Sequence, residues 1–354
     1  MPPLARALGV TRVARLTGLD RTGVEVAAAV RPGGHVLQVS NGKGASFAEA
    51  AAGALHEAAE LWGAERPRPA AWGSADEARA AFHGARVEPL GGGDGARRAW
   101  ALGSDLASAT PVLAPAAAIF CPPAGTALLG ASPLPWTSNG MGAHGDRAAA
   151  LLHALLEAVE RDALARSLPE GFTPREIRRR LLDPASLARA APGTAALAAR
   201  LEARGFRVHL FDATPGRRDL GLPVAGAVLV DLDPGAVPVT AGYACRPARD
   251  AALLAALGEA AQSRLTEIHG AREDVLHGDR CASAPLAAAC AAARPSRPAS
   301  ALPQLAVPPA AALAALVRRL ARLALRPAAF DLPSPPGVHV VKVLVPGFAV
   351  SELL

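Results

Sequence analysis

The chain has 354 residues, which is enough for a large hydrophobic core and for more than one subdomain. Hydrophobic residues make up 51 % of it but aromatic residues only 4 %, so we expect a core of helices and small side chains. The net charge is +6, and arginine supplies most of the cations. No basic run is interleaved with aromatic residues, which argues against nucleic-acid binding.

Cysteine usage and hydropathy narrow the class of protein further. None of the cysteines belongs to a CxxC pair, and their spacing fits neither a disulfide framework nor a zinc ribbon. The amino terminus lacks an apolar segment of the signal-peptide type, and no run of about 18 uncharged apolar residues follows. We therefore expect a cytoplasmic protein with no membrane contact.

The first part of the chain predicts two strands and a helix. Val24–Val30 and His35–Ser40 have strand composition, and an Arg-Pro-Gly-Gly turn would join them as a hairpin. A Gly-rich turn at Asn41–Gly44 then leads into a long Ala-rich helix. Ser46 is the expected N-cap of this helix, with Glu49 three residues further on.

The next part predicts a connecting excursion and a second helix. Residues 64–98 are rich in Pro and Gly, with one short helix expected near Ser74–Phe82. Strands are expected at Trp100–Leu106 and Thr110–Cys121. A second Gly-rich turn, Ser138–Gly142, precedes a long Ala/Leu-rich helix.

The second half repeats this alternation. The expected elements are surface helices after Leu164, a helix at Thr194–Ala203, strands at Phe206–Thr214, Leu222–Leu232 and Val237–Cys245, a third long helix, an amphipathic helix at Ala311–Leu325 and a closing strand at Val338–Gly347. Residues 275–306 are rich in Ala, Pro, Arg and Ser, which predicts a flexible linker or flap.

Three of these stretches share one plan of strand, small-residue turn and Ala-rich helix. A turn glycine precedes the first glutamate of its helix by 15, 17 and 17 residues in the pairs Gly42/Glu57, Gly140/Glu157 and Gly242/Glu259. Each helix carries a polar pair at i,i+3, which places both side chains on one face: Glu57/Glu60, Glu157/Glu160 and Glu259/Gln262. We predict a pseudo-repeat within one domain over 1–354. Its fold class is α+β, with mixed, largely antiparallel sheets covered by helices.

Carboxylates that converge in this way call for a cation. Like charges brought together raise one another's pKa, and Mg²⁺, which prefers oxygen ligands, commonly bridges carboxylates to substrate phosphates. Lys43, in a Gly-rich turn before a helix, suits the phosphate side of such a site. Arg161 and Arg264 add positive charge for an anion. The residues therefore suggest an ATP–Mg²⁺ site between acidic helices.

Other interpretations of the same residues remain open. An ExxE pair on an Ala-rich helix is commonly a solvated face, and Lys43 is not in a Walker A motif, because Gly44 follows it. The i,i+4 pairs His56–Glu60 and His153–Glu157 could ligate a metal in a hydrolase, although HEAAE is not HExxH. Tightly bound zinc would favour that hydrolase.

The sequence resembles the YcaO family of ATP-dependent enzymes that modify peptide backbones. The resemblance extends from about Thr11 to Gly347, through TGLDRTGVEV, SNGKG, ALHEAAE, SDL, SNGMG, LLEAVERDA, EAAQSRLTEIHGARED and VVKVLVPG. The stretches most similar to the TfuA-associated subgroup are VTRVARLTGLDRTGVEV, AAQSRLTEIHGARED and VVKVLVPG.

The resemblance implies particular residues for ATP and Mg²⁺. The implied metal ligands are Glu57, Glu60, Glu157 and Glu160. These four and five further positions would bind the cofactors, the further ones being Lys43, Asn139, Glu259, Gln262 and Arg264. Arg264 would face phosphate. No catalytic acid, base or nucleophile is implied, since such an enzyme acts mainly through positioning and charge stabilisation.

The implied reaction is the activation of a peptide amide. A nucleophile adds to the carbonyl carbon, the oxyanion takes the γ-phosphoryl group of ATP, and phosphate leaves with the amide oxygen. The nucleophile decides the product. A sulfide gives a thioamide, a Cys, Ser or Thr side chain gives an azoline, and an amine gives an amidine. Azoline-forming members often end in a Pro-rich tail, whereas this sequence ends FAVSELL, so we expect thioamide formation on a ribosomally made peptide or protein.

Two positions depart from the family pattern. Gly53 replaces a serine four residues before the first glutamate, and Arg246 replaces the histidine of the third turn. These departures leave open a degenerate domain that presents a precursor peptide to another subunit. The other alternative to thioamidation is an azoline-forming cyclodehydratase. Formation of ADP would separate an enzyme from such a degenerate domain. The expected partners are the peptide substrate, a TfuA-like protein and a second copy in a homodimer.

Overall fold

The computed structural model describes residues 3–88, 90, 95–130, 136–171, 173–215, 220–233, 235, 237–274, 280–295 and 297–349. Helices and three β-sheets alternate along this part of the chain, and the strand pairs are mainly antiparallel. The fold is therefore of the α+β class that the sequence predicted.

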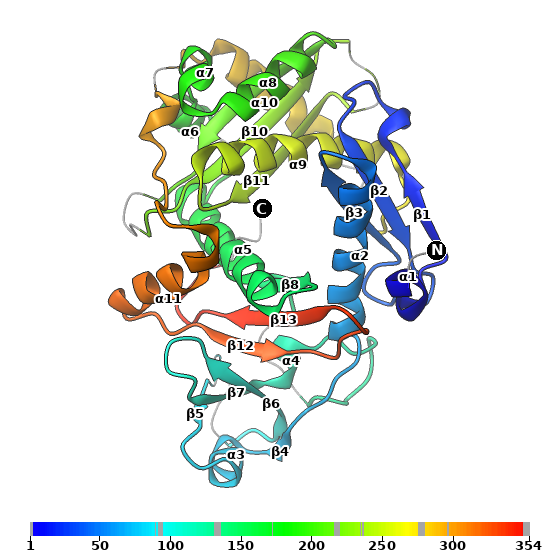
Figure 1. Cartoon of the computed structure of the whole chain (residues 1–354), viewed down its shortest axis with the longest axis vertical. Coiled ribbons are helices and arrows are strands. Elements are labelled where there is room, and N and C mark those ends of the chain that lie inside the picture. The colour runs from blue at the N-terminus through cyan, green and yellow to red at the C-terminus, as the bar shows by residue number, and fades with distance from the viewer. Residues whose placement is uncertain are drawn as a thin grey trace.

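The first sheet lies at the N-terminal side of the molecule (Figure 1). Its elements are α1 (Pro3–Leu8), β1 (Arg12–Arg15), the 3₁₀ helix η1 (Thr17–Leu19), β2 (Glu25–Val30) and β3 (Val39–Gly44), with strand order β1-β2-β3. Helix α2 (Phe47–Ala64) packs against this sheet. Ser46 caps α2 as predicted, because its side chain accepts a hydrogen bond from Glu49 N.

The second strand of this hairpin differs from the prediction. We expected a strand at His35–Ser40 and a turn at Asn41–Gly44, but Asn41–Gly44 belongs to β3, and Val30 pairs with Val39. A contact with Glu65 explains the shift. Its carboxylate pairs with the Arg31 guanidinium at 2.6 and 2.7 Å and accepts the backbone amides that follow the turn, so the intervening segment stays out of the ladder.

The second sheet consists of three strands, and four helices precede it in the sequence. These elements are α6 (Pro174–Arg180), η2 (Pro184–Ser186), α7 (Leu187–Ala190), α8 (Pro192–Glu202), β9 (Phe206–Asp212), β10 (Val224–Asp231) and β11 (Val239–Cys245). The order β11-β10-β9 confirms the three expected strands. One sheet face packs on α8 and α9 (Arg249–His269), whereas Val228 and Phe211 on the other face meet Ile177 of α6.

The third sheet contains the excursion between the first two long helices. Its elements are β4 (Ala71–Gly73), α3 (Ala75–Ala81), β5 (Arg86–Val87), β6 (Arg98–Asp105), β7 (Pro111–Pro115), α4 (Ala116–Ile119), β8 (Met141–His144), α5 (Arg147–Ser167), η4 (Pro309–Ala311), α11 (Ala312–Arg322), β12 (Ala328–Asp331) and β13 (His339–Leu344). The strand order is β5-β7-β6-β12-β13-β8, with β4 beside β6. Residues 64–98 thus contribute two strands as well as the expected helix. The strand expected at Thr110–Cys121 ends at Pro115, where the Ala-rich α4 begins.

The stretch at 275–306 contains more regular structure than its composition suggested. Helix α10 (Arg280–Ala292) and η3 (Ala299–Ala301) lie within it, whereas 275–279 and 296 lie outside the described residues. That this stretch acts as a flap stays a prediction. Across the described ranges, no helix combines the length and the apolar composition that a bilayer span requires.

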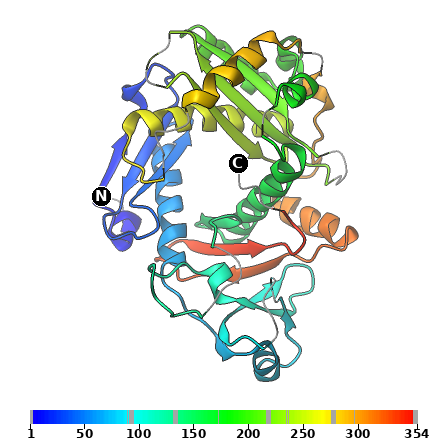
Figure 2. The same cartoon turned by 180° about the vertical axis from the view of Figure 1, so that it is seen from behind.

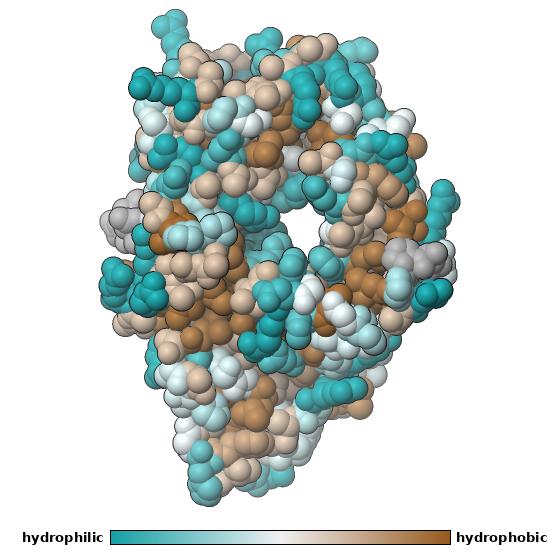
Figure 3. All heavy atoms as spheres, viewed as in Figure 1, coloured by the Kyte–Doolittle hydropathy of each residue, from teal (hydrophilic) through white to brown (hydrophobic). Residues whose placement is uncertain are grey.

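Three strand–helix pairs, β3–α2, β8–α5 and β11–α9, surround an opening through the middle of the molecule, which Figure 3 shows in space-filling form and Figures 1 and 2 show from two sides. We call it the central opening. Each of the three strands is an edge strand of its sheet. In Figure 3, teal hydrophilic residues form part of the rim of this opening, beside tan and brown residues that are more apolar.

Each of these edge strands touches its helix through a glycine. A Cβ atom at Gly42 would lie 2.2 Å from Ala50 O, and one at Gly142 would lie 2.4 Å from Ala150 O. In the third pair, a Cβ at Gly242 would lie 2.4 Å from a carbonyl oxygen of α9. These glycines are needed for close packing inside strands rather than for the turns we predicted.

Candidate functional site

The end of each of the three long helices contacts the edge strand of the next unit. Glu60 of α2 accepts the amide of Ala143 in β8. Glu160 of α5 accepts the amide of Cys245 in β11 at 2.9 Å. On α9 the contact is neutral, because Thr266 Oγ1 accepts from Asn41 Nδ2 of β3 at 2.6 Å. The helices and strands therefore close a ring around the central opening.

The two glutamates of α2 are partly buried. Glu57 Oε2 accepts the amide of Asn41 at 2.6 Å, and burial raises the pKa of Glu57. The pKa of Glu60 lies well above its usual range, first because of burial and then because the charges of Glu157 and Glu57 are near. Because Glu157 belongs to α5, carboxylates of α2 and α5 are near enough to interact electrostatically.

The glutamates of α5 behave in the same way. Burial and the charges of Glu160 and Glu259 raise the pKa of Glu157 to about 7, although Arg161 opposes the shift. Burial and Glu259 raise the pKa of Glu160 as well. Glu259 comes from α9, so all three long helices contribute a carboxylate to one cluster between them. We call Glu57, Glu60, Glu157, Glu160 and Glu259 the acidic cluster.

Cations border the acidic cluster without neutralising it. Lys43 Nζ lies 3.3 Å from Glu259, and Arg161 Nε lies 3.8 Å from Glu160. Arg272 Nη1 lies 3.4 Å from Glu57. The sequence did not single out Arg272, since it follows the C-terminal glycine of α9 and no local pattern links it to a glutamate more than 200 positions away.

Histidines also gather at the opening. The rings of His56 and His144 have centroids 5.7 Å apart. Desolvation by the surrounding protein, and then the charges of Arg246 and Lys43, lower the pKa of His153 to about 4. This imidazole is therefore neutral at pH 7. Among the described residues, no three His, Cys, Asp or Glu side chains are arranged to enclose a metal ion by themselves.

The predicted site residues divide into two groups in the structure. Lys43 and the acidic cluster come together, and Asn139 is half-buried in the turn before β8. Arg264, expected to face phosphate, instead pairs with Asp20 at 3.0 Å and Asp231 at 2.8 Å. Gln262 contributes its backbone carbonyl to Thr266, and we find no side-chain hydrogen bond for it in the described chain.

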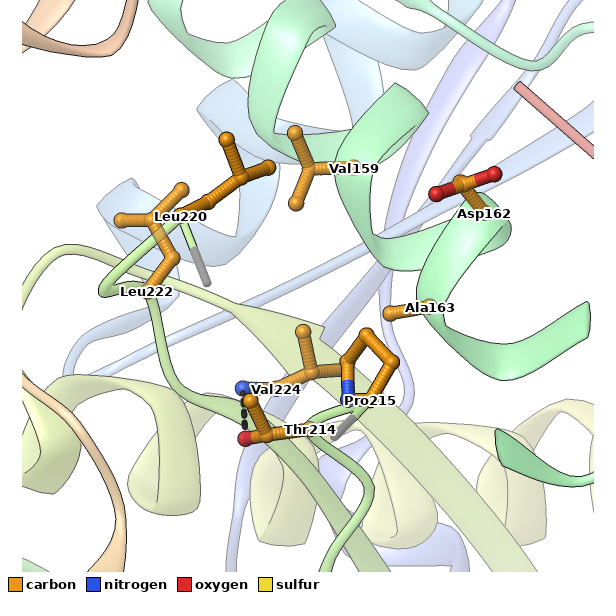
Figure 4. A pocket seen from close by; sticks show the side chains of 8 residues that line it. All are labelled: Val159, Asp162, Ala163, Thr214, Pro215, Leu220, Leu222 and Val224. Carbon is orange, nitrogen blue, oxygen red and sulfur yellow. Dashed lines mark hydrogen bonds between the residues drawn. The ribbon is translucent and has the colours of Figure 1, made fainter. Parts of the chain in front are cut away.

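Two cavities lie away from the acidic cluster. The one in Figure 4, of about 10 Å³, is lined by Val159 and Ala163 of α5 and by Leu220, Leu222 and Val224. It has room for one water molecule at most. A larger cavity, of about 160 Å³, lies beside α7, α8 and β9 and is lined mainly by Leu and Ala. Neither suits a nucleotide, and neither contains a residue of the acidic cluster.

The donor set of the opening suits Mg²⁺ with a polyphosphate. Carboxylates whose pKa values are raised by one another gain most from a nearby cation. Mg²⁺ is usually held by one or two carboxylates together with phosphate oxygens and water, so it does not need a protein cage. Asn41 Oδ1 is buried without a hydrogen-bond partner in the structure, which leaves an acceptor free for a ligand or water.

Comparison with known sequences identifies the family. The family described as YcaO cyclodehydratase, ATP- and Mg²⁺-binding, matches residues 41–349. The chain belongs to the YcaO family. A protein in the tfuA 3′ region of Rhizobium leguminosarum bv. trifolii is 32 % identical over 77 % of the chain, and one from Methanothermobacter thermautotrophicus is 31 % identical over 77 %. The alignments span 66 % and 70 % of these relatives' own length.

Solved structures agree with this assignment. The YcaO protein of Methanopyrus kandleri, bound with AMPPCP and Mg²⁺, superposes with a TM-score of 0.74 at 25 % identity, covering 98 % of this chain and 88 % of that one. A heterocyclase in complex with substrate and cofactor has the same fold, with a TM-score of 0.70 at 19 % identity, covering 96 % of this chain and 50 % of that one. ATP and Mg²⁺, the cofactors predicted from the sequence, are those of the YcaO family.

Proposed function

We propose that this YcaO chain is an ATP- and Mg²⁺-dependent enzyme that activates a backbone amide of a ribosomally made peptide or protein, with thioamide formation as its favoured outcome. The observation that carries the proposal is the acidic cluster, in which carboxylates from three helices interact across one opening. A solvated helix face would not raise the pKa values of Glu57, Glu60, Glu157 and Glu160.

In this proposal the chain's own residues bind and orient. Glu57, Glu60, Glu157 and Glu160 would hold Mg²⁺, and Lys43 and Arg161 would supply positive charge to the phosphate groups. ATP supplies the phosphoryl group with which the amide oxygen departs. The edge-strand amides of Ala143 and Cys245 fix two of the glutamates, so these ligands are ordered before the nucleotide arrives.

The relative from a tfuA region supports the thioamide over the azoline. We infer that a TfuA-like protein is the partner of this chain and that sulfide is the nucleophile. Cyclodehydration is the second candidate, favoured by the description of the family itself. The retained acidic cluster speaks against a degenerate, non-catalytic domain, because such a domain has no need to bury repelling carboxylates.

The test measures phosphate release with a cognate precursor peptide, a TfuA-like protein and sulfide. Loss of the amide oxygen to sulfur adds about 16 Da to the peptide, whereas azoline formation removes about 18 Da, so mass spectrometry separates the two products. Glu157→Gln should abolish turnover and keep the fold. Glu202→Gln, an exposed change on α8, is the matched control. Absence of Mg²⁺·ATP binding by the folded wild type would refute the proposal.

A further inference from the structure

The chain contains two lysines among its 37 cationic side chains, Lys43 and Lys342. Lys43 borders the acidic cluster, as described above. Lys342 lies on β13, directly opposite Met141 of β8 in the sheet register. Arginine is the usual cation of this chain. The two positions that carry lysine instead both lie near the acidic cluster.

Lys342 occupies a place on β13 where an apolar residue would be expected. Its side chain is 1 % exposed, and Val340, two positions away on the same strand face, is part of a hydrophobic core cluster. Burial of an ammonium group is unfavourable unless nearby groups stabilise its charge. Groups near Lys342 must therefore stabilise its ammonium group.

The groups around Lys342 belong to the turn that precedes β8. Its ammonium donates a hydrogen bond to the carbonyl of Thr137 and lies 4.8 Å from the ring centroid of Trp136. The neighbouring strand residue Val343 donates its amide to Gly140 O at 2.7 Å. β13 thus holds both ends of the Trp136–Gly140 turn, and Asn139 lies within this turn.

The positive charge of Lys342 also acts on the acidic cluster. Lys342 interacts electrostatically with Glu157, and in the described part of the chain it forms no ion pair that would neutralise it. Since a buried charge is poorly screened, its field reaches a carboxylate that it does not contact. Arg161 and Lys342 are the two cations that lower the pKa of Glu157, so removal of Lys342 would leave only Arg161 to do so.

We propose that Lys342 is a positioning residue of the nucleotide site, which anchors the Trp136–Gly140 turn from the buried strand β13 and so fixes the position of Asn139. The inference rests on the proposed function of the acidic cluster and adds to it a residue that acts from behind the cluster. An arginine preserves the charge but is larger and carries a planar group, so it replaces Lys342 only in part.

The experiment compares Lys342→Met and Lys342→Arg in the full chain. Binding of the non-hydrolysable analogue AMPPCP is titrated with Mg²⁺ by calorimetry, and thermal unfolding is followed in parallel. We expect K342M to raise the Mg²⁺ concentration for half-maximal binding about tenfold, as is typical for groups behind metal ligands. K342R should stay within about threefold of the wild type, because it retains a cationic donor for the Thr137 carbonyl and the Trp136 ring.

The outcomes separate this inference from the proposed function. A wild type that binds no Mg²⁺·AMPPCP refutes the proposed function and with it this inference. A wild type that binds, together with a folded K342M variant whose Mg²⁺ requirement is unchanged, refutes the role of Lys342 alone. Equal weakening in K342M and K342R would also refute it, since the contacts with Thr137 and Trp136 that an arginine can still make would then be irrelevant. Should K342M not fold, K342Q, which can still donate to Thr137, is judged by the same criteria.

Discussion

The backbone amide of Cys245 donates to Glu160 Oε2 at 2.9 Å, which joins α5 to the edge strand β11 of the next unit. Glu160 therefore has two functions, one in the fold and one in the site. Its carboxylate closes one joint of the ring, and its remaining oxygen lies 3.8 Å from Arg161.

Substitutions of Glu160 should separate these functions. Glu160→Gln keeps an acceptor for the Cys245 amide and removes the charge, so we expect near wild-type stability and strongly weakened Mg²⁺·ATP binding. Glu160→Ala leaves the amide unpaired and should cost about 1–3 kcal/mol of unfolding free energy in addition. Denaturant unfolding and calorimetry measure the two effects. Equal stability of both variants would contradict the role of this hydrogen bond.

Close packing of strand on helix predicts opposite effects for two alanine substitutions. A Cβ at Gly142 would lie 2.4 Å from Ala150 O, so Gly142→Ala must push β8 away from α5 and should destabilise the fold by about 1–3 kcal/mol or more. Gly53 lies inside α2, and a Cβ there would lie 3.4 Å from its nearest neighbour, Gly42 Cα. Gly53→Ala should therefore be neutral or stabilising by up to about 1 kcal/mol. Chemical denaturation of both variants tests this contrast.

The raised pKa of Glu157 predicts how stability depends on pH. Its pKa is about 7 in the folded protein and 4.5 as the ordinary value, so between these limits the folded state binds more protons than the unfolded state. Stability without ligand should then fall as pH rises from about 5 to 7. Lys342, with a pKa lowered to about 7, opposes this trend near the upper end of the window, where the folded state begins to lose a proton that the unfolded state keeps.

Thermal unfolding between pH 5 and 7 checks this expectation. Glu157→Gln lacks the titrating group and should show a smaller pH dependence than the wild type. Mg²⁺·AMPPCP should reduce the dependence as well, because it binds the ionised carboxylates. A wild type and an E157Q variant with identical pH profiles would show that Glu157 is not the group that titrates.

Much of this architecture could be predicted from the sequence, because strands and helices alternate with clear composition and the three acidic helices share one pattern. The prediction failed where contacts between distant segments decide. Asn41–Gly44 has the composition of a turn, yet it pairs with β2 and packs on α2. Arg264 resembles a phosphate ligand, yet Asp20, 244 positions away in sequence, neutralises it. The contacts of Lys342 with the turn before β8 could not be predicted either. The sequence shows only a single lysine in a Val-rich strand.

Lysine acylation should map the site, since the two lysines differ sharply in exposure. The Lys43 side chain is 24 % exposed, whereas Lys342 is 1 % exposed. We expect an amine-reactive acetylating reagent to label Lys43 and to spare Lys342 in the folded protein. Mg²⁺·AMPPCP should protect Lys43 if phosphate occupies its ammonium group. Peptide mass spectrometry measures both sites, and unfolding in urea, which exposes Lys342, provides the control.

The ion pairs of Arg264 and Arg272 predict different consequences for two matched substitutions. Arg264 is 5 % exposed and pairs with Asp20 and Asp231, both of which are buried. Arg264→Met should cost about 3–5 kcal/mol of unfolding free energy, because it leaves the Asp20 carboxylate uncompensated and Asp231 paired with Arg21 alone. Arg272→Met removes the cation beside Glu57, whose side chain is 29 % exposed, so its effect on stability should be small.

In nucleotide affinity, Arg272→Met should have the larger effect and Arg264→Met the smaller one. The folded fraction of R264M should bind Mg²⁺·AMPPCP with an affinity within about threefold of the wild type, since its guanidinium is already occupied in the fold. R272M should weaken binding by about tenfold, because it alters the charge balance around a predicted metal ligand. Calorimetry at a temperature at which both variants are folded decides between them. A large affinity loss in R264M with little loss of stability would return Arg264 to the phosphate-facing role that the family resemblance implied.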